Sequence, residues 1–383
     1  MDPDVVSRSD ASDAPSVNRA QVLAQRVVAH GLDRSSDDPR DLAVAALGIQ
    51  DTPAGSAALS VAARVDDTDD ASIGDGRRWT SVWGARGAPH VHRGGDVRAL
   101  ACALWPADGD DASARLVAGG KQLRNAGVDP LEGLRVTAEA LASIVVEALG
   151  KGEVSAAVTA AIPDSYSVWC RGCDATHVNE QLMRLSALPA GARLVPGRSP
   201  AALEPIPGWG GVPDRQEGLA ALVGSYLRVH GPARPAEVAA YLQTNQSAIK
   251  PNWPEDLAEV SVEGRAAWVL ADQLDDLLSA PAPRLTRLLP RGDPWLMARD
   301  RELTVPDKAN RKALWPVIGA PGAVLVDGEV VGTWRTKASA KRLELTVDPF
   351  ATIKPKIRRE IESEAERIAV VRNCRDIEVT MGR

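Results

Sequence analysis

The sequence predicts an α+β protein. We expect tandem winged-helix units, each with three helices and a β-hairpin, followed by a C-terminal antiparallel β region and a terminal helix. Three observations lead to this prediction. Helical patterns precede hairpin patterns along the chain, one hairpin pattern recurs further on, and part of the last hundred residues alternates apolar with polar side chains.

Residues 16–105 form the first predicted unit. Apolar side chains at helical spacing predict helices over 17–31, 39–49 and 55–65. An acidic loop separates these helices from two strands, predicted over 79–91 around the turn Ala85-Arg86-Gly87. Residues 1–15, ahead of this unit, are expected to be disordered.

The second predicted unit, 106–195, repeats the first hairpin. The matching dipeptides keep their order: Val82-Trp83, Arg86-Gly87 and His90-Val91 align with Val168-Trp169, Arg171-Gly172 and His177-Val178. Helices are predicted upstream over 130–149 and 153–161. A repeat of this length indicates a duplicated supersecondary unit, so one chain supplies several winged helices and a monomer is favoured.

A Pro- and Gly-rich linker, 196–213, precedes the third predicted unit, 214–280. Its helices are predicted from 219, over 235–242 and within 246–257, where two prolines must shorten the last helix. A hairpin follows over 259–270 with a Glu263-Gly264 turn. The final region, 281–383, is expected to be basic and rich in strands, with an Asp327-Gly328 hairpin turn and a terminal amphipathic helix.

Charge is distributed unevenly. The net charge is −6, yet residues 284–383 carry 20 basic and 14 acidic side chains. A DNA-binding surface needs locally clustered Lys and Arg to displace counterions from phosphates, and a negative total does not prevent this. Together with the winged-helix pattern, the basic region predicts double-stranded DNA as the partner.

Two observations bear on location. No stretch approaches the roughly 20 uncharged apolar residues of a membrane span. Residues 1–15 carry four aspartates where a signal peptide has a basic start and an apolar middle. We therefore expect a cytoplasmic, nucleoid-associated protein that does not contact a membrane.

The cysteines are expected to be reduced thiols. Cys170 and Cys173, followed by His177, have spacing that suits a metal, but a fourth ligand is missing nearby. The corresponding His90 in the first hairpin has no cysteine pair beside it, which favours packing over metal binding. No metal site is predicted, and no cofactor is expected because the chain has no Gly-rich phosphate loop.

Candidate DNA contacts come from three regions. Arg86 and His90 lie on the first predicted hairpin, although packing is the alternative for His90. Lys250 lies in the predicted recognition helix of the third unit. Four further cations surround a strand connection in the basic region, where a solvated loop is the alternative: Arg335, Lys337, Lys341 and Arg342.

Several phrases, taken in order, carry a family resemblance. They are Leu47-Gly48-Ile49-Gln50; Arg86-Gly87 with His90-Val91; Gly231-Pro232-Ala233-Arg234-Pro235 with Tyr241; Leu288-Leu289-Pro290 with Asp293; and Val326-Asp327-Gly328-Glu329-Val330-Val331-Gly332-Thr333-Trp334-Arg335. Over about residues 17–350 the chain resembles the bacterial tandem winged-helix superfamily that includes the AlkZ/YcaQ-type DNA glycosylases. The resemblance implies a cleft for DNA, and excision of alkylated bases or unhooking of interstrand crosslinks.

The same resemblance implies a Gln-x-Gln or Gln-x-Asp motif just after the second helix. Such a motif suits a glycosylase, which must position a water and stabilise a positively charged sugar as the base departs. Here the residues are Gln50-Asp51-Thr52, so the carboxylate comes one residue early. On a helix end this shift rotates the side chain by about 100°. The alternative is that Gln50 caps the helix ending at Ile49 and Asp51 begins the turn into Pro53.

Two functional classes therefore stay open. The first is a duplex DNA-binding protein related to DNA repair, and the altered motif favours it. The second is a monofunctional glycosylase that hydrolyses the N-glycosidic bond of alkylated or crosslinked purines. A monomer acting on a flipped base favours this second class, with Gln50 and Asp51 as its candidate catalytic residues.

Overall fold

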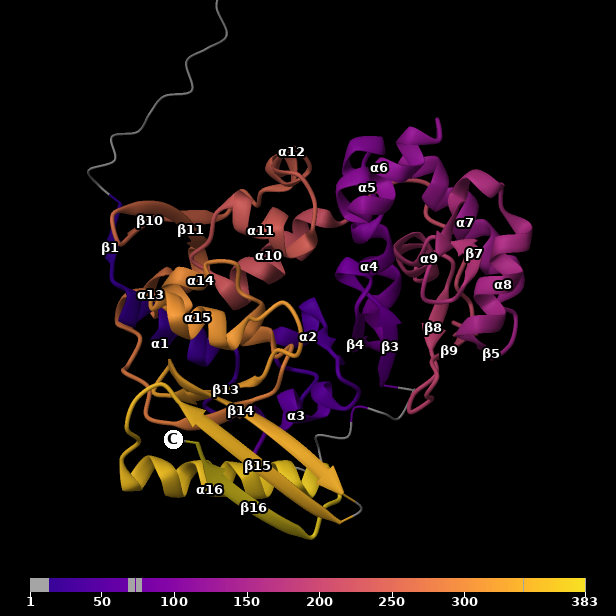
Figure 1. Ribbon diagram of the computed structural model, residues 1–383. Coiled ribbons are helices and arrows are strands. Elements are labelled where there is room, and N and C mark those ends of the chain that lie inside the picture. Colours follow the sequence, from indigo (N-terminus) through magenta and orange to yellow (C-terminus); the bar gives the residue numbers. More distant parts are fainter. Residues whose placement is uncertain (1–13, 68–72, 74–77, 340, 383) are drawn as a thin grey trace, which may run out of the picture.

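The computed structural model describes residues 14–67, 73, 78–339 and 341–382. Helices and strands are mixed along the whole chain, with a five-stranded sheet near the C-terminus, so the predicted α+β class is confirmed (Figure 1). Within these residues, no helix combines the length and apolar character that a membrane crossing requires. The assignment of the repeated units as winged helices stays a prediction.

The N-terminal region contains α1 (Arg19–Ala29), α2 (Val44–Leu47) and α3 (Ser56–Ala62), and a sheet in the order β2 (Ile49–Gln50), β4 (Pro89–Arg93), β3 (Trp79–Trp83). The predicted helix over 39–49 is wrong in extent. Gly48, with φ 78°, ends α2, and a Cβ there would lie 2.2 Å from the His92 ring. The next two residues consequently join the sheet as β2.

The second region follows α4 (Val97–Leu104) and packs its helices around a two-stranded hairpin. Its elements are α5 (Gly109–Leu116), α6 (Ala118–Asn125), α7 (Pro130–Ile144), α8 (Lys151–Ala161), β6 (Ser167–Cys170), β7 (Ala175–Val178) and α9 (Glu180–Ala187). The predicted linker 196–213 is not a continuous loop. It contains β9 (Ala202–Pro205), which pairs with β5 (Leu149–Gly150) and β8 (Ala192–Leu194). Ala202 and Leu203 of this strand are buried.

The third region has the predicted order of three helices and a hairpin: α10 (Leu219–His230), α11 (Pro235–Leu242), α12 (Gln246–Ile249), β10 (Leu257–Val262) and β11 (Arg265–Leu270), followed by α13 (Leu274–Ser279). The hairpin turn has the expected positive φ at both Glu263 and Gly264. Strand β1 (Ser16–Val17) adds to β10, and the Pro15 carbonyl accepts a hydrogen bond from Ser261 N. Residue 15 is therefore ordered, whereas residues 1–13 of the predicted disordered segment lie outside the described residues.

The C-terminal sheet has the order β12 (Thr286–Leu289), β13 (Gly322–Val326), β14 (Glu329–Ser339), β15 (Arg342–Pro349), β16 (Asp376–Met381). The sequence did not predict β16, which pairs parallel to β15. Helix α16 (Pro355–Val371) covers one face, where alternate residues of β15 are buried against it. Two shorter helices, α14 (Arg301–Thr304) and α15 (Lys308–Leu314), lie between β12 and β13 in the chain.

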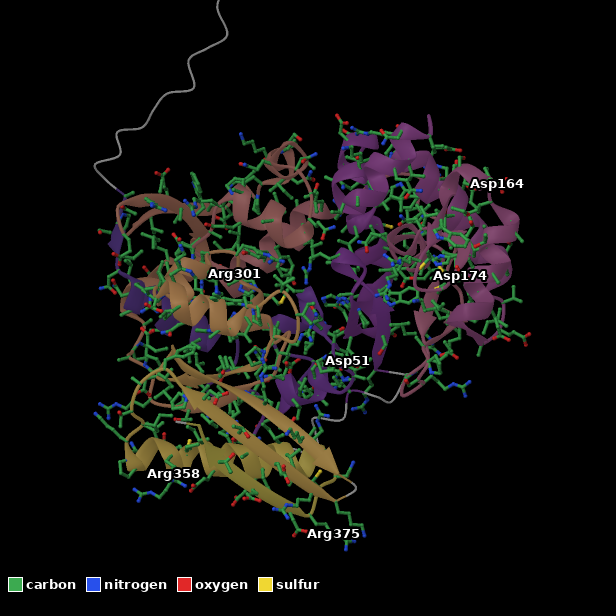
Figure 2. All side chains as sticks on the ribbon, viewed as in Figure 1. Asp51, Asp164, Asp174, Arg301, Arg358 and Arg375 are labelled. Atoms are coloured by element: carbon green, nitrogen blue, oxygen red, sulfur yellow. The ribbon has the colours of Figure 1, made fainter. Side chains whose placement is uncertain are left out.

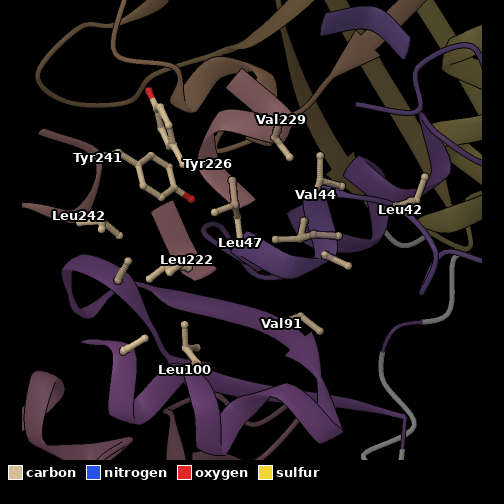
Figure 3. Packing of buried hydrophobic residues seen from close by; sticks show 14 of the residues in the cluster. Leu42, Val44, Leu47, Val91, Leu100, Leu222, Tyr226, Val229, Tyr241 and Leu242 are labelled. Atoms are coloured by element: carbon tan, nitrogen blue, oxygen red, sulfur yellow. The ribbon is translucent and has the colours of Figure 1, made fainter. Parts of the chain in front are cut away.

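One hydrophobic core joins the first and third regions. Leu47 and Val91 from the N-terminal region share it with Leu222, Tyr226 and Tyr241 from α10 and α11 (Figure 3). Segments more than a hundred residues apart in sequence thus fix the β2–β4–β3 sheet against α10 and α11. This packing determines where Gln50 lies.

Candidate active site

Gln50 lies on a strand, so its predicted role as a helix cap is wrong. Ile49 pairs with Val91 and Gln50 pairs with His90. Since successive side chains of a strand point to opposite faces, the fully buried Ile49 leaves Gln50 on the other, half-buried face. Its Oε1 accepts a hydrogen bond from Arg86 Nη2 at 3.3 Å.

A loop from the C-terminal region approaches Gln50 from a second direction. A Cβ on Gly292 would lie 3.4 Å from both Gln50 Nε2 and the Thr52 carbonyl oxygen. The backbone of this loop therefore lies directly over the Gln50-Asp51-Thr52 motif. Gln50 is held between the β3–β4 hairpin and the Gly292 loop.

Arg86 is positioned by a strained backbone and several contacts. Its φ of 63° lies in the left-handed region, which costs a non-glycine residue about 1–3 kcal/mol. The guanidinium donates from Nη1 to the Tyr241 carbonyl at 2.7 Å and lies over the Tyr241 ring, 5.0 Å from its centroid. Gln181 Nε2 donates to the Arg86 carbonyl at 3.2 Å. These contacts stabilise the turn and fix Arg86 beside Gln50.

Asp51 turns towards the helix that follows it. Its Oδ1 accepts a hydrogen bond from Ala57 N at 3.0 Å, in the first turn of α3, and its own N–H donates to Pro89 O at 2.9 Å. Asp51 therefore caps α3, which differs from its expected role in the turn into Pro53. Thr52, at the third position of the motif, has a buried hydroxyl with no hydrogen-bond partner in the described chain.

His90 is not available to DNA in this structure. The side chain is 2% exposed, and its Nδ1–H donates to the Ala88 carbonyl at 2.8 Å. Burial, with smaller effects of Arg86 and His92, lowers the pKa of His90 to about 3. The ring is neutral and packed inside the hairpin, which agrees with the alternative considered for it.

Arg299 is close enough to Arg86 for their charges to interact, although no sequence motif indicated this residue. Burial, together with the charges of Arg86 and Arg301, lowers its pKa to about 10. Its Nε is buried and has no partner among the described residues. Two guanidinium groups that repel each other, one without a carboxylate partner, favour an anion between them. The only available signal was the concentration of basic residues after 284.

A groove extends from this cluster between α11, the β10–β11 hairpin and residues 299–306. It has a volume of about 790 Å³. Five arginines and four carboxylates line it: Arg19, Arg234, Arg265, Arg299 and Arg301, with Glu237, Glu263, Asp300 and Glu302. Arg234 is paired with Glu237, while Arg301 lies over the Trp315 ring. Five arginines against four carboxylates leave the lining of the groove with a small excess of positive charge.

A buried ion pair anchors the Gly292 loop. Arg64 and Asp293 are both fully buried and form two hydrogen bonds of 2.8 Å each. Arg64 also donates to the carbonyls of His30 and Ser60. Because every strong donor of the guanidinium faces an acceptor, the loop is fixed against α3 and the motif that precedes it. Asp293 belongs to the Leu288-Leu289-Pro290 phrase, one of those that carry the family resemblance. That phrase was the sequence signal that indicated this loop.

The other predicted DNA contacts lie apart from Gln50. Lys250 is exposed after α12, and Arg335 and Lys337 are exposed on one face of β14; Lys341 is also exposed. Arg342 is bound by Glu378 and lies 4.0 Å from Glu344, so the basic face expected here is partly neutralised. No hydrogen bond or ion pair of the described residues joins these cations to Gln50 or Asp51. Asp51 lies near the middle of the molecule (Figure 2).

The fold is that of a solved DNA glycosylase. The structure of Streptomyces sahachiroi DNA glycosylase AlkZ superposes with a TM-score of 0.75 and 21% sequence identity, covering 96% of this chain and 100% of that one. At this identity the likeness shows the fold alone. The chain therefore has the same overall fold as that glycosylase.

Sequence comparison identifies the family. The family model for AlkZ-like DNA glycosylases matches residues 44–370, so the chain belongs to the AlkZ-like DNA glycosylase family. A curated relative from Streptomyces sahachiroi, an interstrand DNA cross-link repair glycosylase, is 30% identical over 172 residues. That alignment covers 42% of this chain and 44% of the relative, less than half the relative's length. These comparisons support the interpretation of this chain as a DNA-binding protein related to DNA repair.

Proposed function

We propose that this protein is a monofunctional DNA glycosylase that excises alkylated or crosslinked purines by hydrolysing the N-glycosidic bond. One observation carries the proposal: Gln50, at the first position of the family motif, is held between Arg86 and the Gly292 loop. A side chain that binds water must be held in this way, since misplacement by about 1 Å removes much of the catalytic effect.

The chemistry requires little beyond a positioned water. A purine alkylated at N7 is positively charged, so it departs as a neutral base without being protonated first. The water oxygen bonds to C1′ as the bond from C1′ to N9 breaks, and the bonding electrons neutralise the base. The attacking water loses one proton, which passes to the solvent. Gln50 Oε1 accepts from Arg86 with one lone pair, and its second lone pair accepts a hydrogen bond from the water.

The nearby cations require compensation during this reaction. The sugar becomes positively charged as the base leaves. Arg86, which is hydrogen-bonded to Gln50, and Arg299, whose charge interacts with that of Arg86, would oppose this charge. A DNA phosphate bound between the two guanidinium groups removes the conflict and fixes the damaged strand. Phosphate binding and catalysis are therefore linked in this proposal, and the arginine-lined groove extends the path of the strand.

Asp51 has a smaller part in the proposal. One carboxylate oxygen caps α3, and the charge supports the developing positive charge on the sugar from a fixed position. The capping contact also favours a second candidate function, DNA binding without catalysis. In that case Asp51 is structural, and Thr52 leaves the third position of the motif without an amide or a carboxylate.

A base-release experiment distinguishes these functions. Purified protein is incubated with duplex DNA carrying N7-methylguanine and, separately, with a duplex carrying an N7-linked interstrand crosslink. Alkali-sensitive abasic sites or separated strands are the expected products. Absence of release from both substrates, with gel-shift binding retained, would establish the binding-only function instead.

A further inference from the structure

We propose that Cys170, Cys173 and His177 form a zinc site on the β6–β7 hairpin, with the fourth coordination position open. Their two sulfurs and an imidazole nitrogen all lie within 4.8 Å of one another. With zinc distances of about 2.3 Å to sulfur and about 2.0 Å to nitrogen, tetrahedral ligand atoms are about 3.5 Å apart. Only small side-chain rotations therefore separate this arrangement from an occupied site.

The turn between the cysteines is organised around a sulfur. Cys173 N donates to the Cys170 carbonyl at 3.2 Å, and the N–H groups of Gly172 and Cys173 lie in the same tight turn as the Cys170 sulfur. N–H donors directed at a thiolate stabilise its negative charge, and metal-bound thiolates have such donors around them. Asp174, labelled in Figure 2, closes the turn with φ 51°.

The imidazole of His177 is oriented as a metal ligand. Its Nδ1–H donates to the Val178 carbonyl at 2.7 Å, which leaves the lone pair of Nε2 free for a partner. In the metal-free chain the Cys170 sulfur and a ring nitrogen of His177 lie within 4.8 Å of each other. A metal ion bound between them would keep both groups in place.

The corresponding histidine of the first hairpin does not argue against this site. His90 is buried and bonded to Ala88, whereas His177 is half-buried and Cys173 is exposed to solvent. Packing therefore explains His90 but leaves His177 unexplained. No further Asp, Glu, His or Cys joins the cluster among the described residues, so water fills the fourth position.

A metal ion here would stiffen a weak element. The β6–β7 sheet has only two strands of four residues each, and an isolated sheet of this size is marginally stable. It carries Trp169, which is 63% exposed, next to the first ligand. The predicted effect is a hairpin whose exposed side chains are held in one arrangement when zinc is bound.

Metal titration of the full chain tests this site. Reduced protein, stripped with a chelator, is titrated with Zn²⁺ against a chromophoric competitor and with Co²⁺ under argon. We expect one ion per chain and a thiolate-to-Co²⁺ charge-transfer band. Both are lost in Cys170→Ser and in Cys173→Ser, and weakened in His177→Asn. The matched control is the double variant Cys102→Ser with Cys374→Ser, which retains both.

Proteolysis supplies a second readout, with circular dichroism to check that each variant is folded. Arg171 is exposed between the two cysteines, so Zn²⁺ should slow tryptic cleavage there in the wild type and leave it unchanged in Cys173→Ser. Uptake that survives loss of both cysteines would overturn the proposal. So would failure of the reduced protein to bind either metal at micromolar concentration.

Discussion

Two hairpins of this protein have matching sequences and opposite surroundings. Val82 pairs with His90 across β3–β4, and Val168 pairs with His177 across β6–β7, so the two histidines have the same register. The first hairpin is interior, with Trp83 3% exposed, whereas Trp169 of the second is 63% exposed. The same local pattern therefore supports different chemistry, because the surroundings decide which groups ligands can reach.

The third strand explains the difference. Strand β2 pairs with β4 and brings Gln50 to the first hairpin, while the shared core with α10 and α11 covers that sheet. Among the described residues no third strand pairs with the second hairpin, and Val178 is its buried contact with the neighbouring helices. The first hairpin thus holds a fixed, half-buried site and the second an open one.

The largest difference is expected from the ion pair that anchors the first site. Asp293→Ala leaves Arg64 buried without its partner, which should lower the free energy of unfolding by about 3–5 kcal/mol. Asp174→Asn, on the exposed hairpin, should change it by less than about 0.5 kcal/mol, since Asn tolerates the same positive φ. Urea unfolding measures both; equal effects would remove the distinction between the hairpins.

Acid should act differently on the two matched histidines. The pKa of His90 is lowered to about 3 in the folded state. As the pH falls through about 6.5, the unfolded chain therefore binds a proton at this residue, whereas the folded chain does not. Stability is therefore fully present above about pH 6.5 and falls below it, by about 2 kcal/mol for this residue at pH 5.

The pKa of His177 is raised by its hydrogen bond to the Val178 carbonyl, so its contribution is present at low pH and is lost as pH rises. His90→Asn should reduce the loss of stability between pH 7 and pH 5, and His177→Asn should not. Urea unfolding of the metal-free protein at both pH values is the measurement. An identical loss in His90→Asn and the wild type would show that His90 does not govern this range.

The matched arginines should differ by a smaller amount. Arg86→Ala removes two side-chain hydrogen bonds and the stacking on Tyr241, at an expected cost of about 1–3 kcal/mol. Arg171→Ala, at the corresponding exposed position, should cost less than about 0.5 kcal/mol. Thermal unfolding in parallel compares them. A larger effect at Arg171 would reverse the assignment of buried and open hairpins.

The smallest effect is expected from variants on the C-terminal sheet. They test whether bound DNA extends there from the first hairpin. Replacing Arg335 and Lys337 by Ser should weaken binding to all sequences and reduce the slope of log affinity against log salt by about 1 per phosphate contact. Arg342→Gln should have less effect, because Glu378 already binds this guanidinium. Unchanged slopes in both variants would place the DNA elsewhere.

Local patterns were enough to predict much of the fold. The Asp327-Gly328 turn, the order of α10 to α12 and the alternation of β15 depend on residues close together in sequence. The missed strands β2, β9 and β16 have two to six residues, and their partners are distant in the chain. Helix α6 was also missed, since Gly119 and Gly120 weaken its helical pattern.

The site could be predicted only in part. The resemblance selected Gln50 and Arg86, which the structure brings together. The resemblance did not predict how the residues of the site lie relative to one another. Arg64 and Asp293 are 229 positions apart in sequence, and the charges of Arg299 and Arg86 interact only once the chain has folded. The orientation of Asp51 was also inaccessible, since it depends on where α3 begins.

The most direct test of the proposed function is the single-turnover rate of N7-methylguanine release by Gln50→Ala. If Gln50 positions the attacking water, the rate should fall by about 10²–10³-fold while the variant still binds DNA and unfolds like the wild type. Gln122→Ala, a half-buried and hydrogen-bonded glutamine on α6, is the matched control and should retain the wild-type rate. A rate for Gln50→Ala within about threefold of the wild type would contradict a catalytic role for this residue.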